Sequence, residues 1–190
     1  MIPKTIIHLL SGGLDSVTML YDLKAQGHSV HCLLCDYKQT HIRELDFARW
    51  HCQRQGVLCT TLEIPPLEGL TVASWIVPNR NAVLLSLAVN TAIKAGADTV
   101  TIGCNAEDAE NFPDCRKPFL DAMNAAVRAA GYAVEICAPY LDWAKWKIAR
   151  LASDMAIPAD SIWTCYRGGE TPCGTCPACI KFATALAISK

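Results

Sequence analysis

The segment Ser11–Ser16, with the sequence SGGLDS, carries residues whose types and spacing suit phosphate binding. It follows the apolar stretch 6–10, typical of a strand, and precedes 17–23, whose apolar residues recur at helical spacing. Glycines let such a turn bring backbone N–H groups close to an anion, and the first turn of the helix adds partial positive charge. Asp15 is placed to hold Mg²⁺ against a phosphate. The alternative is a glycine-rich turn without a ligand.

A second candidate site is a group of four cysteines near the C-terminus with the spacing C-x7-C-x2-C-x2-C, namely Cys165, Cys173, Cys176 and Cys179. Glycine and proline between them permit tight turns. Four thiolates at this spacing can surround a tetrahedral zinc ion at roughly 2.3 Å. Such a site has no open position, so we expect a structural Zn²⁺ that holds the C-terminal segment in place. An iron–sulfur cluster and disulfides are the alternatives.

The composition is that of one main domain with a full core, since the chain has 190 residues, of which 52% are hydrophobic and 18% charged. A net charge of −1 gives no reason to expect nucleic acid as a direct ligand. The longest apolar run, 82–93, is interrupted by Ser86 and Asn90 and is too short to span a membrane. No signal peptide is recognisable.

Seven of the eleven cysteines are scattered through apolar strand and helix patterns. We interpret them as small buried hydrophobic residues of a protein in the reducing cytoplasm: Cys32, Cys35, Cys52, Cys59, Cys104, Cys115 and Cys137.

Strands and helices are predicted to alternate along the chain, which favours an α/β fold: a doubly wound, mostly parallel five-stranded sheet with helices on both faces. Residues 1–157 are assigned to this domain, and 158–190 to a zinc-clipped segment with a C-terminal helix packed on it. Ligands of open parallel sheets bind beyond the carboxyl ends of the strands. Strands are expected at 6–10, 29–35, 57–64, 99–104 and 133–137, and helices at 17–26, 41–55, 81–95, 119–130 and 142–155.

The SGGxDS segment resembles the pyrophosphate loop of N-type ATP pyrophosphatases, and the whole chain resembles the 7-cyano-7-deazaguanine synthase (QueC) family. Both resemblances imply an adenine nucleotide α-hydrolase-like fold. The second rests on further motifs along nearly the full length: Asp36-Tyr37 with Gln39 and His41, VPNRN at 77–81, GCNAED at 103–108, PDCR at 113–116, Ala138-Pro139 with Lys145, and Thr164-Cys165-Tyr166 followed by the other three cysteines.

The resemblance implies a ligase that uses ATP and Mg²⁺ to convert 7-carboxy-7-deazaguanine and ammonia to 7-cyano-7-deazaguanine (preQ0) through an acyl adenylate and an amide, for queuosine or deazaguanine-DNA precursors. It also implies a cytoplasmic homodimer. Asp15 and Lys145 are the expected catalytic residues. ATP would contact Leu10, Ser11, Gly12, Gly13, Leu14, Asp15, Ser16 and Asp36. The deazaguanine would contact Arg80, Asn81, Asn105, Asp108, Asp114 and Arg116, and which arginine holds its carboxylate is left open.

The chain departs from the family pattern at a few positions. Lys38 stands where the family usually has glycine, and Lys181 is the candidate to replace a catalytic arginine, unless that role is lost. The segment 65–76 is shorter than usual, which predicts a reduced lid or dimer contact. A tRNA thiolase, another amidating ligase and a catalytically inactive nucleotide-binding module are the alternative functions.

Overall fold

A computed structural model describes residues 2–67 and 76–189 of the chain. The strands are β1 (Thr5–Leu9), β2 (Ser29–Asp36), β3 (Leu58–Glu63), β4 (Thr99–Thr101) and β5 (Glu135–Cys137). The α-helices are α1 (Leu14–Ala25), α2 (Glu44–Gln55), α3 (Arg80–Ala95), α4 (Asp108–Asn111), α5 (Lys117–Ala129), α6 (Lys145–Asp154) and α7 (Pro177–Ile188), with short 3-10 helices η2 (Pro113–Cys115) and η3 (Ala159–Ser161).

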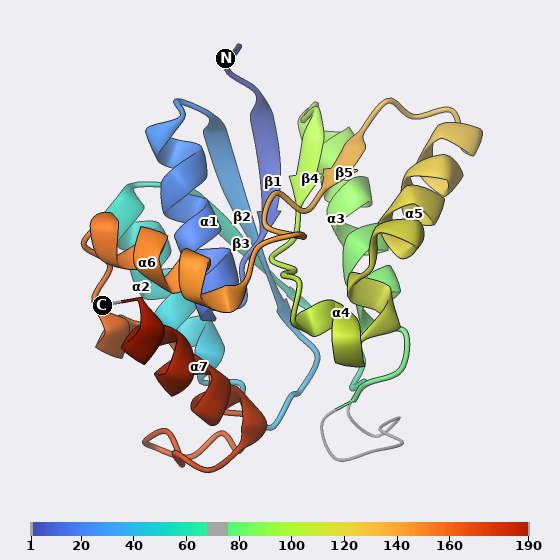
Figure 1. Cartoon of the computed structure of the whole chain (residues 1–190). Coiled ribbons are helices and arrows are strands. Elements are labelled where there is room, and N and C mark those ends of the chain that lie inside the picture. The colour runs from blue at the N-terminus through green and yellow to red at the C-terminus, as the bar shows by residue number, and fades with distance from the viewer. Residues whose placement is uncertain (1, 68–75, 190) are drawn as a thin grey trace.

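The five strands form one parallel sheet, as predicted, and the structure shows their order to be β3-β2-β1-β4-β5 (Figure 1). The chain runs from β1 outward to β2 and β3, then returns to place β4 on the other side of β1. The carboxyl ends of β1 and β4 therefore diverge into the loops where open α/β sheets bind ligands.

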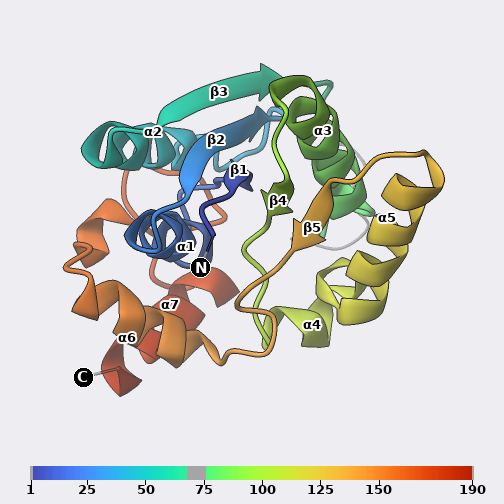
Figure 2. The ribbon, with the colours of Figure 1, turned by 90° about the horizontal axis from the view of Figure 1, so that it is seen from above.

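Helices cover both faces of the sheet, which confirms the doubly wound prediction. Helices α1, α2, α6 and α7 lie on one face and α3 and α5 on the other (Figure 2). Each strand contributes side chains to the hydrophobic cores on both faces of the sheet, because successive side chains point to opposite faces. In β1, Ile6 is buried against the first group of helices and Ile7 against the second.

Several elements begin later or end earlier than predicted. The chain turns at 41–43, so α2 begins at Glu44. Strand β4 ends at Thr101, and Gly103 then passes so close to the first turn of α1 that a Cβ there would lie 3.0 Å from the backbone nitrogen of Ser16. Helix α6 begins at Lys145, because Ala144 has an extended backbone.

The C-terminal segment shares the core of the α/β fold. Helix α7 packs on α6, and Ile162 and Ala185 belong to the same buried cluster as Ile6. The division at residue 157 stays a prediction. Most of the short 65–76 segment lies outside the described residues, which exclude 68–75. None of the helices that the structure describes combines the length and apolar character of a membrane span.

Candidate active site

The phosphate loop lies between β1 and α1 and is held by its two serines. The hydroxyl of Ser16 accepts from the Ser11 amide (3.2 Å), contacts the Ser11 hydroxyl (3.0 Å), and donates to the Gly13 carbonyl (3.2 Å). Gly12 has a left-handed backbone (φ +86°), and a Cβ there would collide with the backbone carbonyl of Glu44 in α2. The loop is therefore both pre-shaped and packed against the neighbouring helix, as a site for an anion at the start of a helix requires.

Asp15, in the first turn of α1, forms an ion pair with Lys145 at the start of α6. Lys145 Nζ lies 3.0 Å from Asp15 Oδ2, and both side chains are only 13% exposed. Burial alone would lower the pKa of Lys145, but attraction by Asp15 and Asp108 outweighs it and raises the pKa above its usual value. The lysine is therefore held in its charged form beside the phosphate loop.

Asn105, after β4, joins the two buried carboxylates of the site. Its Nδ2 lies 3.1 Å from Asp15 Oδ2 and 2.7 Å from Asp108 Oδ2, and it is fully buried. Its Oδ1 accepts from the amides of Glu107 and Asp108, which fixes the loop. Burial, the largest cause, raises the pKa of Asp108 to about 6, with a further contribution from Asp15 against the attraction of Lys145.

The donor set around Asp15 fits a small hard cation. The Oδ1 atom of Asp15 is buried and has no hydrogen-bond partner among the described residues, while Oδ2 is taken by Lys145 and Asn105. Mg²⁺ prefers carboxylate oxygens and phosphates. The unpaired oxygen, with Asp108 nearby, is the kind of ligand that an Mg²⁺–triphosphate would use.

His8 is a buried residue beneath the loop that the sequence interpretation missed. It is fully buried in β1, and its Nε2 donates to the Ser16 carbonyl at 2.8 Å while Nδ1 lies 2.8 Å from the Thr101 hydroxyl. Burial lowers the pKa of His8 to about 4, so the ring is neutral near pH 7. Its position in the strand, three residues before Ser11, gave no signal, because alternate strand residues usually belong to the core.

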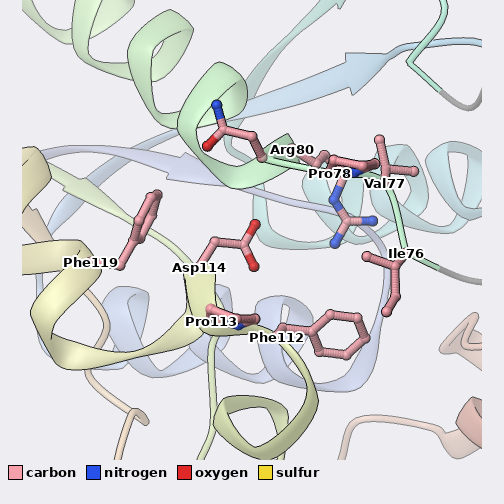
Figure 3. A pocket seen from close by; sticks show the side chains of 9 residues that line it. Ile76, Val77, Pro78, Arg80, Phe112, Pro113, Asp114 and Phe119 are labelled. Atoms are coloured by element: carbon pink, nitrogen blue, oxygen red, sulfur yellow. The ribbon is translucent and has the colours of Figure 1, made fainter. Parts of the chain in front are cut away.

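A cavity of about 430 Å³ opens beside the start of α3 (Figure 3). Its polar lining residues are Asn79, Arg80 and Asp114, and the charged ends of Arg80 and Asp114 project into the same space in Figure 3. Arg80 donates to the Tyr37 hydroxyl at 3.3 Å, and its buried Nε has no hydrogen-bond partner in the described ranges. Burial would lower the pKa of Arg80, but Tyr37 and Glu44 outweigh it and raise the pKa.

Asn81 and Arg116 have contacts that hold neighbouring elements. The backbone N–H of Asn81 donates to Asp114 Oδ2 at 3.2 Å, and the side-chain Nδ2 of Asn81 donates to the backbone carbonyl of Asp114 at 3.2 Å. Arg116 is exposed, and its Nε donates to the Ala109 carbonyl of α4 at 2.7 Å. The structure thus brings Asn81 and Asp114 together, and it places Arg116 outside the lining of the cavity.

Asp36 lies at the carboxyl end of β2 and is bound by Lys38. The Lys38 amide donates to Oδ1 (2.9 Å), its Nζ lies 3.2 Å from Oδ2, and the backbone hydrogen bond is the largest cause that lowers the pKa of Asp36. Lys38 has φ +60°, a left-handed conformation that glycine adopts without strain. Lys38 therefore has a backbone conformation that is uncommon for residues other than glycine.

The four C-terminal cysteines come together as one cluster, in which all four Sγ atoms lie within 4.8 Å of one another. The Cys173 amide donates to Cys165 Sγ (3.4 Å) and the Cys176 amide to Cys173 Sγ (3.3 Å). A backbone hydrogen bond from Thr175 is the largest cause that lowers the pKa of Cys173 to about 6, while burial raises that of Cys179 to about 12. The cluster is compatible with zinc.

The segment that leads into this cluster covers the phosphate loop. The Trp163 amide donates to the Gly12 carbonyl at 3.0 Å, and Gly168 (φ +64°) passes so close to Thr40 that a Cβ would collide with the Thr40 carbonyl. Burial, the largest cause, raises the pKa of Tyr166, and Asp108, Lys145 and Arg80 also act on it. Tyr166, which belongs to the Thr164-Cys165-Tyr166 motif, is therefore within electrostatic reach of the charged residues of the site.

Lys181 in α7 is partly buried, and its charge lowers the pKa of Asp108. This lysine therefore reaches the same electrostatic environment as Asp15 and Lys145, although it comes from the last helix.

The prediction that the scattered cysteines are buried is wrong for Cys59, which is exposed, and Cys137, which is partly buried. Cys59 lies on β3, an edge strand whose first three residues are exposed, and Cys137 ends the opposite edge strand. The other five are buried.

Solved structures with the same fold include the NMN synthetase from Francisella tularensis, with a TM-score of 0.61 and 14% identity over 98% of this chain and 84% of that one. The U34-tRNA thiolase NcsA from Methanococcus maripaludis, solved with a 4Fe–4S cluster, gives a TM-score of 0.58 and 16% identity over 97% of this chain and 65% of that one. These likenesses concern the fold: the chain is an α/β protein with the architecture of these two enzymes.

The chain belongs to the QueC family: the family model described as "Queuosine biosynthesis protein QueC" matches residues 5–190. Relatives named 7-cyano-7-deazaguanine synthase include that of Psychromonas ingrahamii, 35% identical over 206 residues that cover 97% of this chain and 93% of that protein. That of Caldicellulosiruptor bescii is 37% identical over 195 residues, covering 91% and 88%.

Proposed function

We propose that this protein is a 7-cyano-7-deazaguanine synthase, an ATP-dependent carbon–nitrogen ligase. Family membership and the names of its relatives support the overall reaction. The observation that carries the chemistry is the buried Asp15–Lys145 pair beside a pre-shaped glycine loop, because it provides a cation and a metal ligand where a triphosphate would lie.

The first step is adenylation of 7-carboxy-7-deazaguanine. Its carboxylate oxygen attacks the α-phosphorus of ATP, the bond to the bridging oxygen breaks, and pyrophosphate leaves. The amides of the loop and the hydroxyls of Ser11 and Ser16 bind the departing pyrophosphate. Lys145 Nζ stabilises the negative charge that develops on the α-phosphate oxygens.

Asp15 Oδ1, with Asp108 nearby, would hold the Mg²⁺. When bound, the cation neutralises charge on the phosphate oxygens. The amide of Asn105 keeps the two carboxylates in place, and His8 anchors the Ser16 carbonyl beneath them. Asp36, at the end of β2, would contact the adenosine.

Ammonia then attacks the acyl carbon, AMP leaves, and the amide forms with loss of a proton. The amide oxygen then attacks the α-phosphorus of a second ATP, and pyrophosphate leaves. Loss of both protons from nitrogen and expulsion of AMP give the nitrile. Lys181, whose charge acts on Asp108, is suited to stabilise negative charge on the phosphate oxygens in either adenylation, that of the carboxylate or that of the amide. We place a structural Zn²⁺ in the cysteine cluster, where it would hold the segment with Trp163 and Tyr166 over the loop.

We place the enzyme in the cytoplasm, because all eleven cysteines are free thiols. We also propose a homodimer, by resemblance to the family, which light scattering of the purified protein would test.

The test is incubation of the purified zinc-loaded protein with ATP, Mg²⁺, ammonium and 7-carboxy-7-deazaguanine, with nitrile, amide and AMP followed by mass spectrometry and Asp15→Ala as the inactive control. Nitrile from the wild type alone supports the synthase. Amide without nitrile limits the enzyme to the first half of the chemistry. AMP without either product would mean that another carboxylate is the substrate.

A further inference from the structure

Three cysteines form a second thiol cluster, on the face of the sheet that α2 covers: Cys32 in β2, Cys52 in α2 and Cys59 in β3. Cys32 and Cys59 are paired in register across the parallel strands β2 and β3, so their side chains point to the same face. Cys32 and Cys52 belong to one hydrophobic core, formed where α2 packs along these two strands (Figure 2). The three thiols are therefore neighbours in space.

Cys52 is the central member of this thiol cluster. Its sulfur accepts hydrogen bonds from the thiols of Cys32 and Cys59, and the bond from Cys32 is the largest cause that lowers the pKa of Cys52. A lower pKa increases the fraction of the nucleophilic thiolate. Cys52 is only 1% exposed, so a dissolved reagent does not reach it directly. Its reaction partner is therefore a neighbouring sulfur.

Cys59 is the member of the cluster that solvent reaches. It is exposed, because β3 is an edge strand whose first three residues are exposed. Partial desolvation, the largest cause, raises the pKa of Cys59, whereas attraction by Arg49 of α2 lowers it. Arg49 Nη2 lies 3.4 Å from the Thr61 hydroxyl, which keeps the guanidinium over this strand. An oxidant in solution therefore meets Cys59 first.

Cys52 suits a disulfide with Cys59 better than Cys32 does. Registered residues of neighbouring strands carry their Cβ atoms side by side, about 4.8 Å apart. A disulfide requires about 3.5–4.5 Å between Cβ atoms. Cys52 approaches from a helix above the sheet, so its side chain points toward the strand residue instead of running beside it. The geometry therefore favours the pair from α2 and β3.

A shared metal ion does not fit this thiol cluster. Within the described residues, the C-terminal cysteines are the only group of three or more such ligands whose ligand atoms all lie within 4.8 Å of one another. Zinc requires its sulfur ligands at about 2.3 Å, which brings the sulfurs closer to each other than those of the thiol cluster are. Thiol–disulfide chemistry is therefore the better interpretation.

We propose that Cys52 and Cys59 form a reversible disulfide, in which Cys59 reacts with an oxidant and Cys52 resolves the product. With a small disulfide such as glutathione disulfide, the Cys59 thiolate attacks one sulfur and a glutathione thiolate leaves. The Cys52 thiolate then attacks Cys59 Sγ and expels the second glutathione thiolate. The two protein thiols are oxidised, glutathione disulfide is reduced to two glutathione molecules, and the protons of the protein thiols pass to the released thiolates.

This pairing protects the exposed thiol of Cys59. An exposed cysteine without a resolving thiol is open to oxidation to the sulfinic and sulfonic acids, which cellular thiols do not reverse. A disulfide with Cys52 is reversed by the same exchange chemistry that forms it. The pair therefore acts as a modification site at the edge of the sheet.

The test exposes the zinc-loaded protein to excess glutathione disulfide, blocks the remaining thiols with iodoacetamide, and maps tryptic peptides by mass spectrometry. Trypsin cleaves after Lys24, Lys38, Arg49, Arg54 and Arg80, which places the three thiols on separate peptides: 25–38, 50–54 and 55–80. We expect peptides 50–54 and 55–80 to be joined in the wild type. Dithiothreitol should separate them again.

Three variants assign the roles of the two thiols. Cys52→Ala, which keeps a small apolar side chain in the core, should accumulate the mixed disulfide of glutathione with Cys59. Cys59→Ser should leave Cys52 unmodified, because solvent does not reach Cys52. Cys137→Ser, on the opposite edge strand, is the matched control and should form the link as the wild type does. In the wild type, Cys59 should react about tenfold faster than the less exposed Cys137.

Several results would overturn the proposal. One is glutathione that stays on Cys59 of the folded wild type without a link to peptide 50–54. A link between peptides 55–80 and 25–38 would assign the partner as Cys32 instead, and a disulfide between two chains on a non-reducing gel would exclude the internal pair. Thermal melts verify that Cys52→Ala folds, and the wild-type and Cys59→Ser maps decide the matter if it does not. None of these readouts needs a substrate, so they are independent of the proposed reaction.

Discussion

Lys145 Nζ lies 3.0 Å from Asp15 Oδ2, although 130 positions separate the two residues in the chain. Asp15 is in the first turn of α1 and Lys145 begins α6, so the amino ends of two packed helices meet at this pair. Each helix end carries partial positive charge, which disfavours a lysine unless anions are nearby. Asp15 therefore offsets the charge that Lys145 adds at these helix ends and holds the ammonium group beside the loop, where a triphosphate would be bound.

Replacing Lys145 with methionine should lower pyrophosphate release at saturating ATP about a hundredfold or more, because the α-phosphate loses its cation. The neighbouring exposed Lys147→Met is the control, since Lys147 packs over Trp146 at the surface. Rates should be measured with a coupled pyrophosphate assay, and thermal melts should verify folding. A folded Lys145→Met variant with more than a third of the wild-type rate would contradict this role.

Gly12→Ala and Gly27→Ala should differ sharply although both glycines have a left-handed backbone, with φ of +86° and +82°. A Cβ at Gly27 meets nothing within 4 Å, whereas one at Gly12 collides with the Glu44 carbonyl. We expect Gly27→Ala to cost about 1 kcal/mol of the free energy of unfolding, from backbone strain alone. Gly12→Ala should cost clearly more and weaken ATP binding. Urea denaturation measures both, and equal losses would exclude the packing argument.

His8 should make the protein less stable in mild acid. Its pKa is lowered from 6.5 to about 4 by burial, so below pH 6.5 the unfolded chain binds a proton that the folded chain does not. The contribution of His8 to the free energy of unfolding is fully present above pH 6.5 and falls by about 3 kcal/mol as the pH drops to 4. His8→Gln should flatten this dependence in urea titrations between these pH values.

The matched variant for that experiment is His31→Gln, in β2, whose side chain is partly exposed. It makes the same change of residue type outside the core and so controls for the substitution itself. If His8→Gln kept the wild-type slope, the acid sensitivity would have to come from other groups.

Cys176→Ser should abolish zinc binding and pyrophosphate release, because the cluster holds the segment that contacts the phosphate loop through Trp163 and Gly12. Elemental analysis of the wild type should give one zinc ion per chain. Cys59→Ser, which changes an exposed thiol outside the cluster, should retain zinc and activity. Iron and acid-labile sulfide in anaerobically purified protein would instead point to an iron–sulfur cluster.

Much of the architecture could be predicted from local patterns. Apolar runs bounded by turn-forming residues located all five strands, and the parallel arrangement, though not the strand order, followed from the alternation of strands and helices. The boundaries at Glu44, Thr101 and Lys145 were missed, because tertiary contacts set them. Strand β4, for example, ends where Gly103 must pass beside the backbone of Ser16.

Two local sites could be predicted from residue types and spacing alone: the glycine loop with Asp15, and the four cysteines whose spacing lets their sulfurs meet. Both depend on residues only a few positions apart, so short-range geometry was enough. Only the tertiary structure decided that Asn105 joins Asp15 to Asp108, that His8 holds the loop from below, and that Arg80 rather than Arg116 lines the cavity. The contacts of Asn105 with Asp15 and of Lys145 with Asp15 span 90 and 130 positions, and they exist because the sheet and its helices pack in one particular order.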